Sequence, residues 1–282
     1  MSVETAMAAD EREFTMTQAD FERISSLAME YSGIVLAQHK RDMVYSRIAR
    51  RLRALKMTTF DAYLNYLQQH HDTEASEFIN ALTTNLTSFF REAHHFSYLQ
   101  DELFPALKSV NQHSKRLRIW SAGCSIGQEV YSIAMTLKQC GFPPDWDIKL
   151  LATDLDSNVV ATGKAGIYPA EHADSIDSQL MKRFFRRSGD GRSVQIKQEL
   201  RQLVTFKRLN LLESWPMKGP FDIIFCRNVV IYFNKDTQKT LFDRYAEMLP
   251  VGGHLFIGHS ENLNGISQRF ENLGNTIYRK IQ

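Results

Sequence analysis

Hydrophobic residues in the first part of the chain recur at the spacing of helices. Thr17 and Asp20 form a capping signal before a helix that we expect to run to about residue 31 and to end at Gly33. Over residues 40–56, apolar side chains lie three or four positions apart and define one buried stripe, which consists of Val44, Ile48, Leu52 and Leu55. This segment therefore predicts an amphipathic helix.

The same periodicity continues to about residue 85. Thr58 and Asp61 frame another helix start, and a further helix is expected over 74–82. We predict a flexible tail over 1–13, a small all-helical domain over 14–85, and a linker with a connecting helix over 86–114.

After the polar stretch 111–115 the pattern changes to strand-like runs that alternate with helical ones. This alternation predicts an α/β domain over 115–282, built on a parallel sheet that is covered by helices. The expected strands cover residues 116–121, 148–153, 204–209, 221–227, 254–258 and 276–280. Residues 163–202 look like an insertion between the second and third strands, with a helix near 179–186 and a hairpin near 189–191.

Composition narrows the class of protein. The chain is 43% hydrophobic and 23% charged, which is enough for an ordinary core. Its apolar runs are far shorter than a membrane span, and its acidic start lacks the pattern of a signal peptide, so we expect a soluble, cytoplasmic protein. Three cysteines without CxxC spacing argue against a disulfide framework or a zinc site, and a net charge of +2 does not by itself indicate a nucleic-acid partner.

The loop after the first expected strand has the features of a nucleotide site. The segment SAGCSIGQE (121–129) leads directly into a helical run, and Gly123 and Gly127 allow a sharp turn and a close approach to a ligand. A glycine pair alone is equally consistent with an ordinary tight turn. The next strand ends at Asp154, where a doubly wound fold places an acid for ribose hydroxyls. Asp154 could instead cap the following helix, although Asp156 is better placed to do so.

The glycine loop also separates two classes of cofactor. A dinucleotide dehydrogenase would have the third glycine of GxGxxG, but Val130 stands three positions after Gly127. An adenosine without a pyrophosphate fits this loop better.

Five segments resemble the chemotaxis receptor glutamate methyltransferases of the CheR type. They are HKRDMVYSRIARRLRAL, INALTTNLTSFFREAHHF, WSAGCSIGQEVYSIAM, GPFDIIFCRNVVIYF and GGHLFIGHSEN, in the order that the family has them. The resemblance runs from about Phe21 onward. It implies a Rossmann-like S-adenosylmethionine-dependent methyltransferase domain, a small N-terminal all-α domain and a small β-subdomain insertion. It also implies methyl ester formation on glutamate side chains of the cytoplasmic helical region of chemotaxis receptors, with S-adenosylhomocysteine as the product.

The resemblance assigns the cofactor contacts to specific positions. They are Asn85, Thr87, Arg91, Glu129, Asp154, Asn210, Leu211, Arg227 and Asn228. The glycine loop itself adds Gly123 to the expected cofactor site. Two acids suit an amino group and ribose hydroxyls, and an arginine suits a carboxylate. Without the resemblance, Asn85 and Thr87 would be interpreted as helix caps and Arg91 as a solvated side chain. The chain departs from the family's STGEEPYS at three positions, which are Ile126, Gln128 and Val130.

Methyl transfer to a carboxylate requires no general base, since a glutamate is already ionised at neutral pH. In agreement, the sequence shows no Ser/His/Asp or metal constellation, and its nine histidines are scattered. Tyr232 and Arg91 are the candidate catalytic residues, which would orient the reactants. Tyr232 as an ordinary packed aromatic is the alternative.

A basic stripe marks the helix expected over 40–56. Arg47, Arg50 and Arg53 are predicted to lie along its outer face, either as a solvated surface or, as the resemblance implies, as a docking surface for acidic receptor helices. In some family members the β-subdomain also holds a tethering peptide from the receptor's C-terminus.

Two other functions compete with this hypothesis. A nucleic-acid methyltransferase would show Asn or Asp before Pro-Pro and an aromatic after the fourth strand, where this chain has CRNVVIY. A receptor-binding module that has lost its activity is the second alternative, which the altered IGQEV loop favours.

Overall fold

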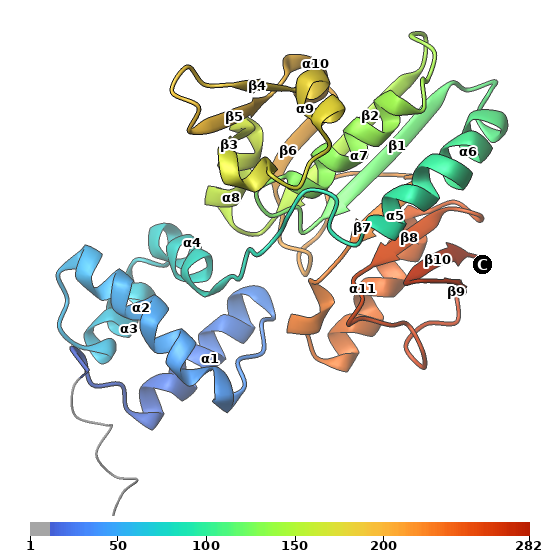
Figure 1. Cartoon of the computed structure of the whole chain (residues 1–282). Helices are drawn as coiled ribbons and strands as arrows, with labels where there is room; N and C mark the ends of the chain where they lie inside the picture. Colours follow the sequence, from blue (N-terminus) through green and yellow to red (C-terminus); the bar gives the residue numbers. More distant parts are fainter. Residues whose placement is uncertain (1–11) are drawn as a thin grey trace, which may run out of the picture. The chain divides into compact units, whose positions relative to one another are not determined.

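The structure, a computed structural model, describes residues 12–282 and divides into two compact units between Thr83 and Thr84 (Figure 1). The tail expected over 1–13 falls mostly outside the described residues. No helix in the described part of the chain is long and apolar enough to cross a membrane. All three cysteines are free thiols.

The described residues of the N-terminal unit form four α-helices. They are α1 (Gln18–Ser32), α2 (Arg41–Leu55, after a 3-10 turn at Gln38–Lys40), α3 (Phe60–Gln69) and α4 (His71–Leu82). The predicted start of α1 is confirmed, because Thr17 and Asp20 form a reciprocal capping box and Gly33 ends the helix at φ +69°. Helix α3 is capped by Thr59, whose side chain accepts the Ala62 N–H at 3.2 Å, and not by Thr58.

An ion pair lies inside this helical unit. Arg51 on α2 donates to both carboxylate oxygens of Glu74 on α4, and the Tyr63 hydroxyl of α3 donates to Glu74 Oε1 at 3.0 Å. Glu74 is 3% exposed and Tyr63 is fully buried, so burial raises the pKa of Tyr63 and keeps its hydroxyl a donor. The network connects three of the four helices beside the apolar stripe, of which Val44, Ile48 and Leu52 are fully buried.

The second unit is built on a seven-stranded sheet (Figure 1). Its strands are β1 (Arg116–Ala122), β2 (Asp147–Asp154), β6 (Val204–Arg208), β7 (Ile223–Cys226), β8 (His254–Ile257), β9 (Phe270–Gly274) and β10 (Ile277–Lys280). The order is β6-β2-β1-β7-β8-β10-β9, and the first five strands are parallel while β10 is antiparallel to both of its neighbours. The strand order reverses between β1 and β7, which is where doubly wound folds bind ligands.

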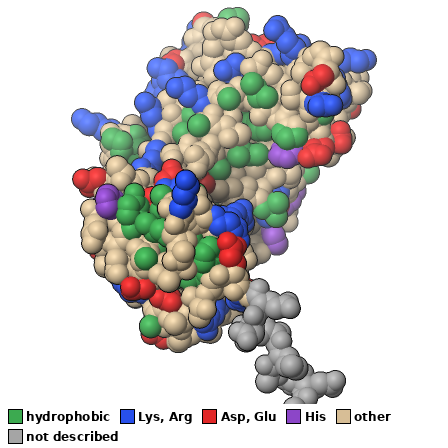
Figure 2. All heavy atoms as spheres, turned by 90° about the vertical axis from the view of Figure 1, so that its left-hand side faces the viewer, with side chains coloured by type: hydrophobic (Ala, Val, Ile, Leu, Met, Phe, Trp, Pro, Cys, Tyr) green, Lys and Arg blue, Asp and Glu red, His purple; other side chains and the backbone are tan. Residues whose placement is uncertain are grey.

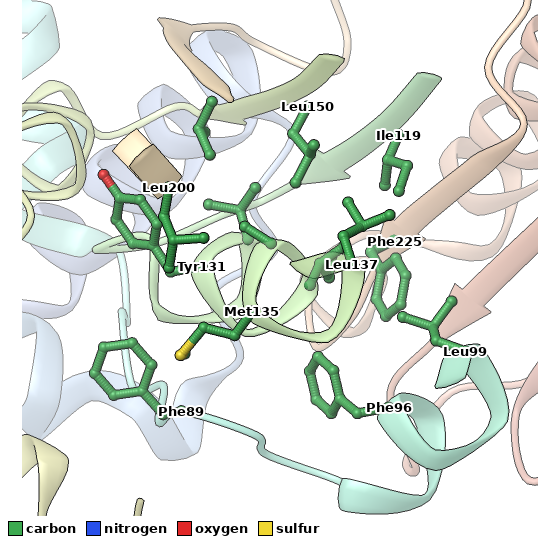
Figure 3. Close-up of a cluster of buried hydrophobic side chains, with 14 of the residues drawn as sticks. Phe89, Phe96, Leu99, Ile119, Tyr131, Met135, Leu137, Leu150, Leu200 and Phe225 are labelled. Atoms are coloured by element: carbon green, nitrogen blue, oxygen red, sulfur yellow. The ribbon is translucent and has the colours of Figure 1, made fainter. Parts of the chain in front are cut away.

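Helices cover both faces of the sheet. Successive residues of β1 show why: Ile119 packs on one face against α7 (Gln128–Gln139), and Trp120 packs on the other against α11 (Lys235–Met248). Figure 3 shows the first cluster, in which side chains of β1, β2 and β7 face those of α7 and of a helix that begins at Ala93. This last helix comprises α5 (Ala93–Tyr98), a π-helical turn (Leu99–Leu103) and α6 (Phe104–Val110). Part of the segment predicted as a linker therefore contributes to the core.

The insertion after α8 (Ser157–Ala165) forms a separate small sheet. Its strands β3 (Ile167–Pro169), β4 (Phe185–Arg187) and β5 (Ser193–Ile196) are antiparallel in the order β3-β5-β4, joined by a 3-10 turn (Ala170–Ala173) and α9 (Ser178–Phe184). The expected hairpin near 189–191 connects β4 to β5. The short α10 (Gln198–Arg201) leads into β6. The sequence did not indicate β9, in which only Phe270 is buried.

Candidate active site

The loop after β1 is held against the ends of two neighbouring strands. The N–H groups of Gly123 and Cys124 both donate to the Thr153 carbonyl of β2, at 2.8 and 2.9 Å. Gly123 has φ +89°, and a Cβ there would lie 2.3 Å from Val229 Cγ2, beyond β7. Gly127, at φ +88°, starts α7, and a Cβ there would lie 2.9 Å from Phe206 Cζ. Both positions therefore require glycine for backbone conformation and for space.

Asp154 lies at the end of β2 with its carboxylate turned toward this loop. Oδ2 accepts the Ser125 N–H at 2.8 Å, and Oδ1 accepts the Asp156 N–H at 3.0 Å. Burial raises the pKa of Asp154 to about 6, although these backbone donors act in the opposite direction. Each oxygen keeps a lone pair for a further donor such as a ribose hydroxyl. Asp156, as predicted, is the cap of α8 and accepts the Asn158 N–H at 2.8 Å.

Glu129 and Arg227 form a buried ion pair across the β1–β7 junction. Glu129 Oε1 accepts from the Ser121 hydroxyl at 2.8 Å, and Oε2 accepts from Arg227 Nη1 at 3.0 Å. The Arg227 side chain is 2% exposed and also donates to the Arg91 carbonyl at 2.6 Å. Burial raises the pKa of Glu129, and Arg227 opposes this rise. Arg227 thus compensates the charge of Glu129 before any ligand is considered.

A second acid, Glu92, shares this guanidinium. Its Oε2 lies 3.4 Å from Arg227 Nη2, and its Oε1 lies 3.2 Å from His259 Nδ1. Burial raises the pKa of Glu92, but Arg227 and His259 together outweigh burial and lower it. Glu92 was not among the predicted site residues. The residue has φ +58° and stands directly before α5.

Histidines from two parts of the chain lie around Glu92: His94 and His95 follow it in the sequence, and His259 comes from the loop after β8. The possible ligand atoms of Glu92, His94 and His95 lie within 4.8 Å of one another, so among the described residues this group has the composition of a metal site. However, Arg227 already balances Glu92, and His95 Nε2 donates to the Asn275 carbonyl at 3.0 Å. Burial also lowers the pKa of His95 to about 4, which keeps the ring neutral. We interpret the group as an ion-pair cluster.

The segment before α5 crosses toward the same loop. Asn85 Nδ2 donates to Asp156 Oδ2 at 2.8 Å, and the Ser125 hydroxyl donates to the Asn85 carbonyl at 2.9 Å. The neighbouring caps are Thr83 for α4 and Glu92 for α5, so Asn85 and Thr87 are not helix caps. Thr87 and Arg91 are half-buried in this segment, and Arg91 Nη1 donates to the Leu86 carbonyl at 2.9 Å.

The residues predicted after β6 and β7 lie at the same edge of the sheet. Asn210 Oδ1 accepts the Leu212 N–H at 3.0 Å, and Leu211 is 7% exposed within the core on the α11 face. A pocket opens beside Leu211 and the start of α11, and it is lined by Leu211, Leu212, Asp236, Thr237, Thr240, Leu241 and Arg244. Asn228 has φ +58° in a segment that continues to Tyr232, which lies half-buried in a 3-10 turn (Val230–Tyr232).

Glu261, a residue that the sequence did not single out, holds this segment. Its carboxylate is 5% exposed and accepts backbone N–H groups from Asn228, Val229 and Val230, each at 2.9 Å. In the sequence Glu261 belongs to a polar run after a strand, and nothing local indicates that its partners lie about thirty residues earlier.

The three departures from the family's loop are accommodated inside the fold. Val130 is fully buried, and Gln128 is 1% exposed with its Nε2 3.3 Å from His172 Nδ1 of the insertion. The Ile126 carbonyl accepts the Tyr168 hydroxyl of β3 at 2.8 Å. The altered loop keeps both glycine conformations and is connected to the small sheet.

The basic stripe on α2 differs from the prediction at one position. Arg47 does not lie on the outer face with the other two arginines, because its guanidinium donates to the Leu82 and Thr83 carbonyls at the end of α4. Arg50 and Arg53 are exposed, and Arg53 pairs with Glu13 at 2.8 Å. Figure 2 shows basic and acidic side chains intermingled on the visible face.

Comparison with known proteins identifies relatives of both units. Residues 85–279 match the family model "CheR methyltransferase, SAM binding domain", and residues 19–83 match "CheR methyltransferase, all-alpha domain". The chemotaxis protein methyltransferase of Escherichia coli (strain K12) is 45% identical over 269 residues, which cover 93% of this chain and 91% of the relative. Chemotaxis protein methyltransferase 2 of Pseudomonas aeruginosa is 43% identical over 271 residues, or 95% of each chain.

Proposed function

The chain belongs to the CheR methyltransferase family, and on this basis we propose that it esterifies glutamate side-chain carboxylates on the cytoplasmic part of chemotaxis receptors. Membership of the family makes it an S-adenosylmethionine-dependent methyltransferase of chemotaxis. The observation that supports our proposal best is the composition of the switch point. It presents an acid whose oxygens can accept further hydrogen bonds, and a charge-compensated acid beside a polar segment.

The residues at the switch point fit the cofactor in chemical terms. Asp154 at the end of β2 is suited to the ribose hydroxyls, and the Gly123 turn lets the backbone approach the ligand closely. Glu129, whose charge Arg227 compensates, is suited to a second hydrogen bond from an amino group. Asn85, Thr87, Arg91, Asn210, Leu211 and Asn228 complete the proposed contacts from the neighbouring segments.

When bound, S-adenosylmethionine would supply an electrophilic methyl group, which would pass to an oxygen of the ionised glutamate as the carbon–sulfur bond breaks and the sulfur keeps the electron pair in S-adenosylhomocysteine. The protein needs to hold the attacking oxygen in line and to exclude water, rather than to move a proton. We propose that Tyr232 and Arg91 orient the two reactants.

The Tyr232 hydroxyl can be tested directly. We expect Tyr232→Phe to lower the turnover number about tenfold or more while the affinity for S-adenosylhomocysteine stays within about twofold, because the lost hydroxyl acts on the incoming carboxylate. Radiolabelled methyl transfer gives the first quantity and isothermal titration the second. Unchanged turnover would remove Tyr232 from the mechanism.

We propose that Arg50 and Arg53 on α2 dock the acidic methylation helices of the receptor. Charge attraction speeds encounter and weakens as salt is added. Arg50→Ala should therefore reduce receptor methylation at low salt and have little effect at high salt, whereas Lys149→Ala, a basic side chain that is 70% exposed on β2, serves as the matched control. Equal rates for both variants at low salt would contradict docking through α2.

The small sheet is our proposed site for a tethering peptide of the receptor. In the order β3-β5-β4 the two outer strands each have one edge outside the sheet, to which an extended peptide can add. Titration of the protein with a peptide from a receptor C-terminus tests whether the small sheet binds it. The rates of methylation of receptors with and without that peptide sequence show whether tethering contributes to activity.

The whole proposal depends on cofactor binding and transfer. Titration with S-adenosylmethionine and S-adenosylhomocysteine, for the wild type and Asp154→Ala, should give micromolar binding that the variant loses. Methyl incorporation into receptor-containing membranes, released as methanol by base, should accompany it. Cofactor binding without transfer to any receptor would favour a binding module that has lost activity.

A further inference from the structure

Glu261 makes an unusual set of contacts for an acidic side chain. Oε1 accepts the N–H groups of Val229 and Val230 at 2.9 Å and of Ile231 at 3.4 Å, while Oε2 accepts those of Asn228 at 2.9 Å and Gly258 at 2.7 Å. Five backbone donors thus converge on one buried carboxylate. Such convergent N–H groups normally form a binding site for an external anion.

The segment that these donors belong to cannot satisfy them itself. Residues 228–231 leave β7, pass through φ +58° at Asn228 and enter a short 3-10 turn, so the first N–H groups of the turn have no carbonyl in the preceding turn to bond. Buried N–H groups without acceptors are costly. Glu261 supplies the acceptor from the loop after β8.

Two close approaches show that the position of this segment is narrowly defined. A Cβ at Gly258 would lie 2.5 Å from Asn228 Nδ2, and a Cβ at Gly123 would lie 2.3 Å from Val229 Cγ2. The segment is therefore enclosed between the loops after β1 and β8. It includes Asn228 and leads directly into Tyr232, and the proposed function places these two residues beside the cofactor and the incoming carboxylate.

We propose that Glu261 is a positioning residue for methyl transfer, which fixes the segment 228–231 and occupies its N–H groups so that side chains, and not this backbone, receive the substrate carboxylate. The inference rests on the proposed function. It assigns Glu261 no contact with either reactant. An internal carboxylate at this point also prevents a second anion from binding in a non-productive place beside Tyr232.

The chemistry of the side chain gives specific expectations for variants. Glu261→Gln keeps the shape but replaces one oxygen by an NH2 group, which cannot accept from the N–H groups that face it. Glu261→Ala removes the acceptor entirely and leaves five donors around a space of carboxylate size. Burial raises the pKa of Glu261, and the backbone donors oppose that rise because they bind the ionised carboxylate.

The test combines methyl transfer with hydrogen exchange, using the full chain and receptor-containing membranes. In Glu261→Ala we expect the turnover number to fall at least tenfold and the amides of 228–231 to exchange at least tenfold faster. Sodium formate should restore part of the turnover number and part of the protection of these amides from exchange. Sodium chloride at equal ionic strength should restore neither. Asn264→Ala, an exposed position in the same loop, is the control that should change neither.

Several outcomes separate the possibilities. Turnover within twofold of the wild type in both Glu261 variants, or no change in exchange at 228–231, would overturn the inference. If the alanine variant fails to fold, the isosteric Glu261→Gln decides by the same two measurements. If the wild type methylates no receptor, the proposed function fails instead, and the exchange data still show whether Glu261 holds the segment.

Discussion

The buried carboxylate of Asp154 predicts that cofactor affinity depends on pH. Its pKa is raised to about 6 by burial, and hydroxyl donors bind the ionised form. If the ligand binds only this form, the apparent dissociation constant grows by the factor 1 + 10^(pKa − pH), which is about 1.1 at pH 7 and about 11 at pH 5. We therefore expect S-adenosylhomocysteine to bind about tenfold more weakly at pH 5 than at pH 7.

Isothermal titration between pH 5 and pH 8 measures this effect, with Asp154→Asn as the matched control. The variant should bind the ligand more weakly at every pH, but the part of the pH dependence that comes from Asp154 should be absent. Any pH dependence that arises from the ligand or from other groups is common to both proteins and cancels in the comparison. An equal pH dependence in the two proteins would refute the reasoning.

The raised pKa of Asp154 also affects the stability of the ligand-free protein, where it favours the protonated carboxyl rather than the ionised one. The folded pKa lies above the unfolded value of 3.8, so the contribution of Asp154 to stability is fully present below pH 3.8 and is lost as the pH rises through about 6. A shift of about two units corresponds to about 3 kcal/mol. Urea unfolding of the wild type and Asp154→Asn at pH 5 and pH 7 should show that the variant gains relative stability at the higher pH.

Two further predictions concern stability and loop geometry. Glu74→Gln should lower the unfolding free energy of the N-terminal unit by about 2–4 kcal/mol in urea, because it removes the buried charge opposite Arg51 and replaces one of the two oxygens that accept from Arg51 and Tyr63 by an NH2 group. Glu77 lies 3.8 Å from Arg51 and is 44% exposed, so Glu77→Gln should cost less than about 1 kcal/mol; equal losses would contradict the network. Gly123→Ala should weaken cofactor binding at least tenfold, because the added carbon would displace the loop from Val229. Gly141 is also at positive φ but has no atom within 4 Å of the added carbon, so Gly141→Ala should leave binding unchanged. Similar affinities of the two variants in titration would show that the close contact with Val229 is unimportant.

Local sequence patterns were sufficient to predict most helices and strands of the fold. Thr17 and Asp20 bond to each other's backbone, so the start of α1 depends on four neighbouring residues. The six expected strands are also found. Five of them are buried parallel strands, which are short apolar runs that turn residues separate, and the sixth, β10, is antiparallel to its neighbours. The helix expected to reach residue 186 ends at Phe184, since Phe185 pairs with Ile196 in β4. That pairing is not visible in the local sequence.

What the sequence could not supply are contacts between distant segments. A helical pattern placed Arg47 on the outer face, but its guanidinium donates to the Leu82 and Thr83 carbonyls at the end of α4. Glu92 and Glu261 look like ordinary loop acids, and their roles depend on Arg227 and on the amides of 228–231. The site contacts carried over from the family remain predictions, although the structure places Asp154, Glu129 and Arg227 at one edge of the sheet.

The position of β10 between β8 and β9 has a consequence for the order of folding. Among the described residues strand β9 pairs with β10 alone, in an antiparallel ladder from Phe270 to Gly274, although it precedes β10 in the chain. Until β10 has paired, β9 has no partner in the sheet and the edge of β8 is exposed, which is the kind of unpaired edge that promotes association between partly folded chains. Insertion of one strand thus completes two ladders in a single late step, and substitutions that weaken β10 should reduce the yield of folded protein more than its final stability.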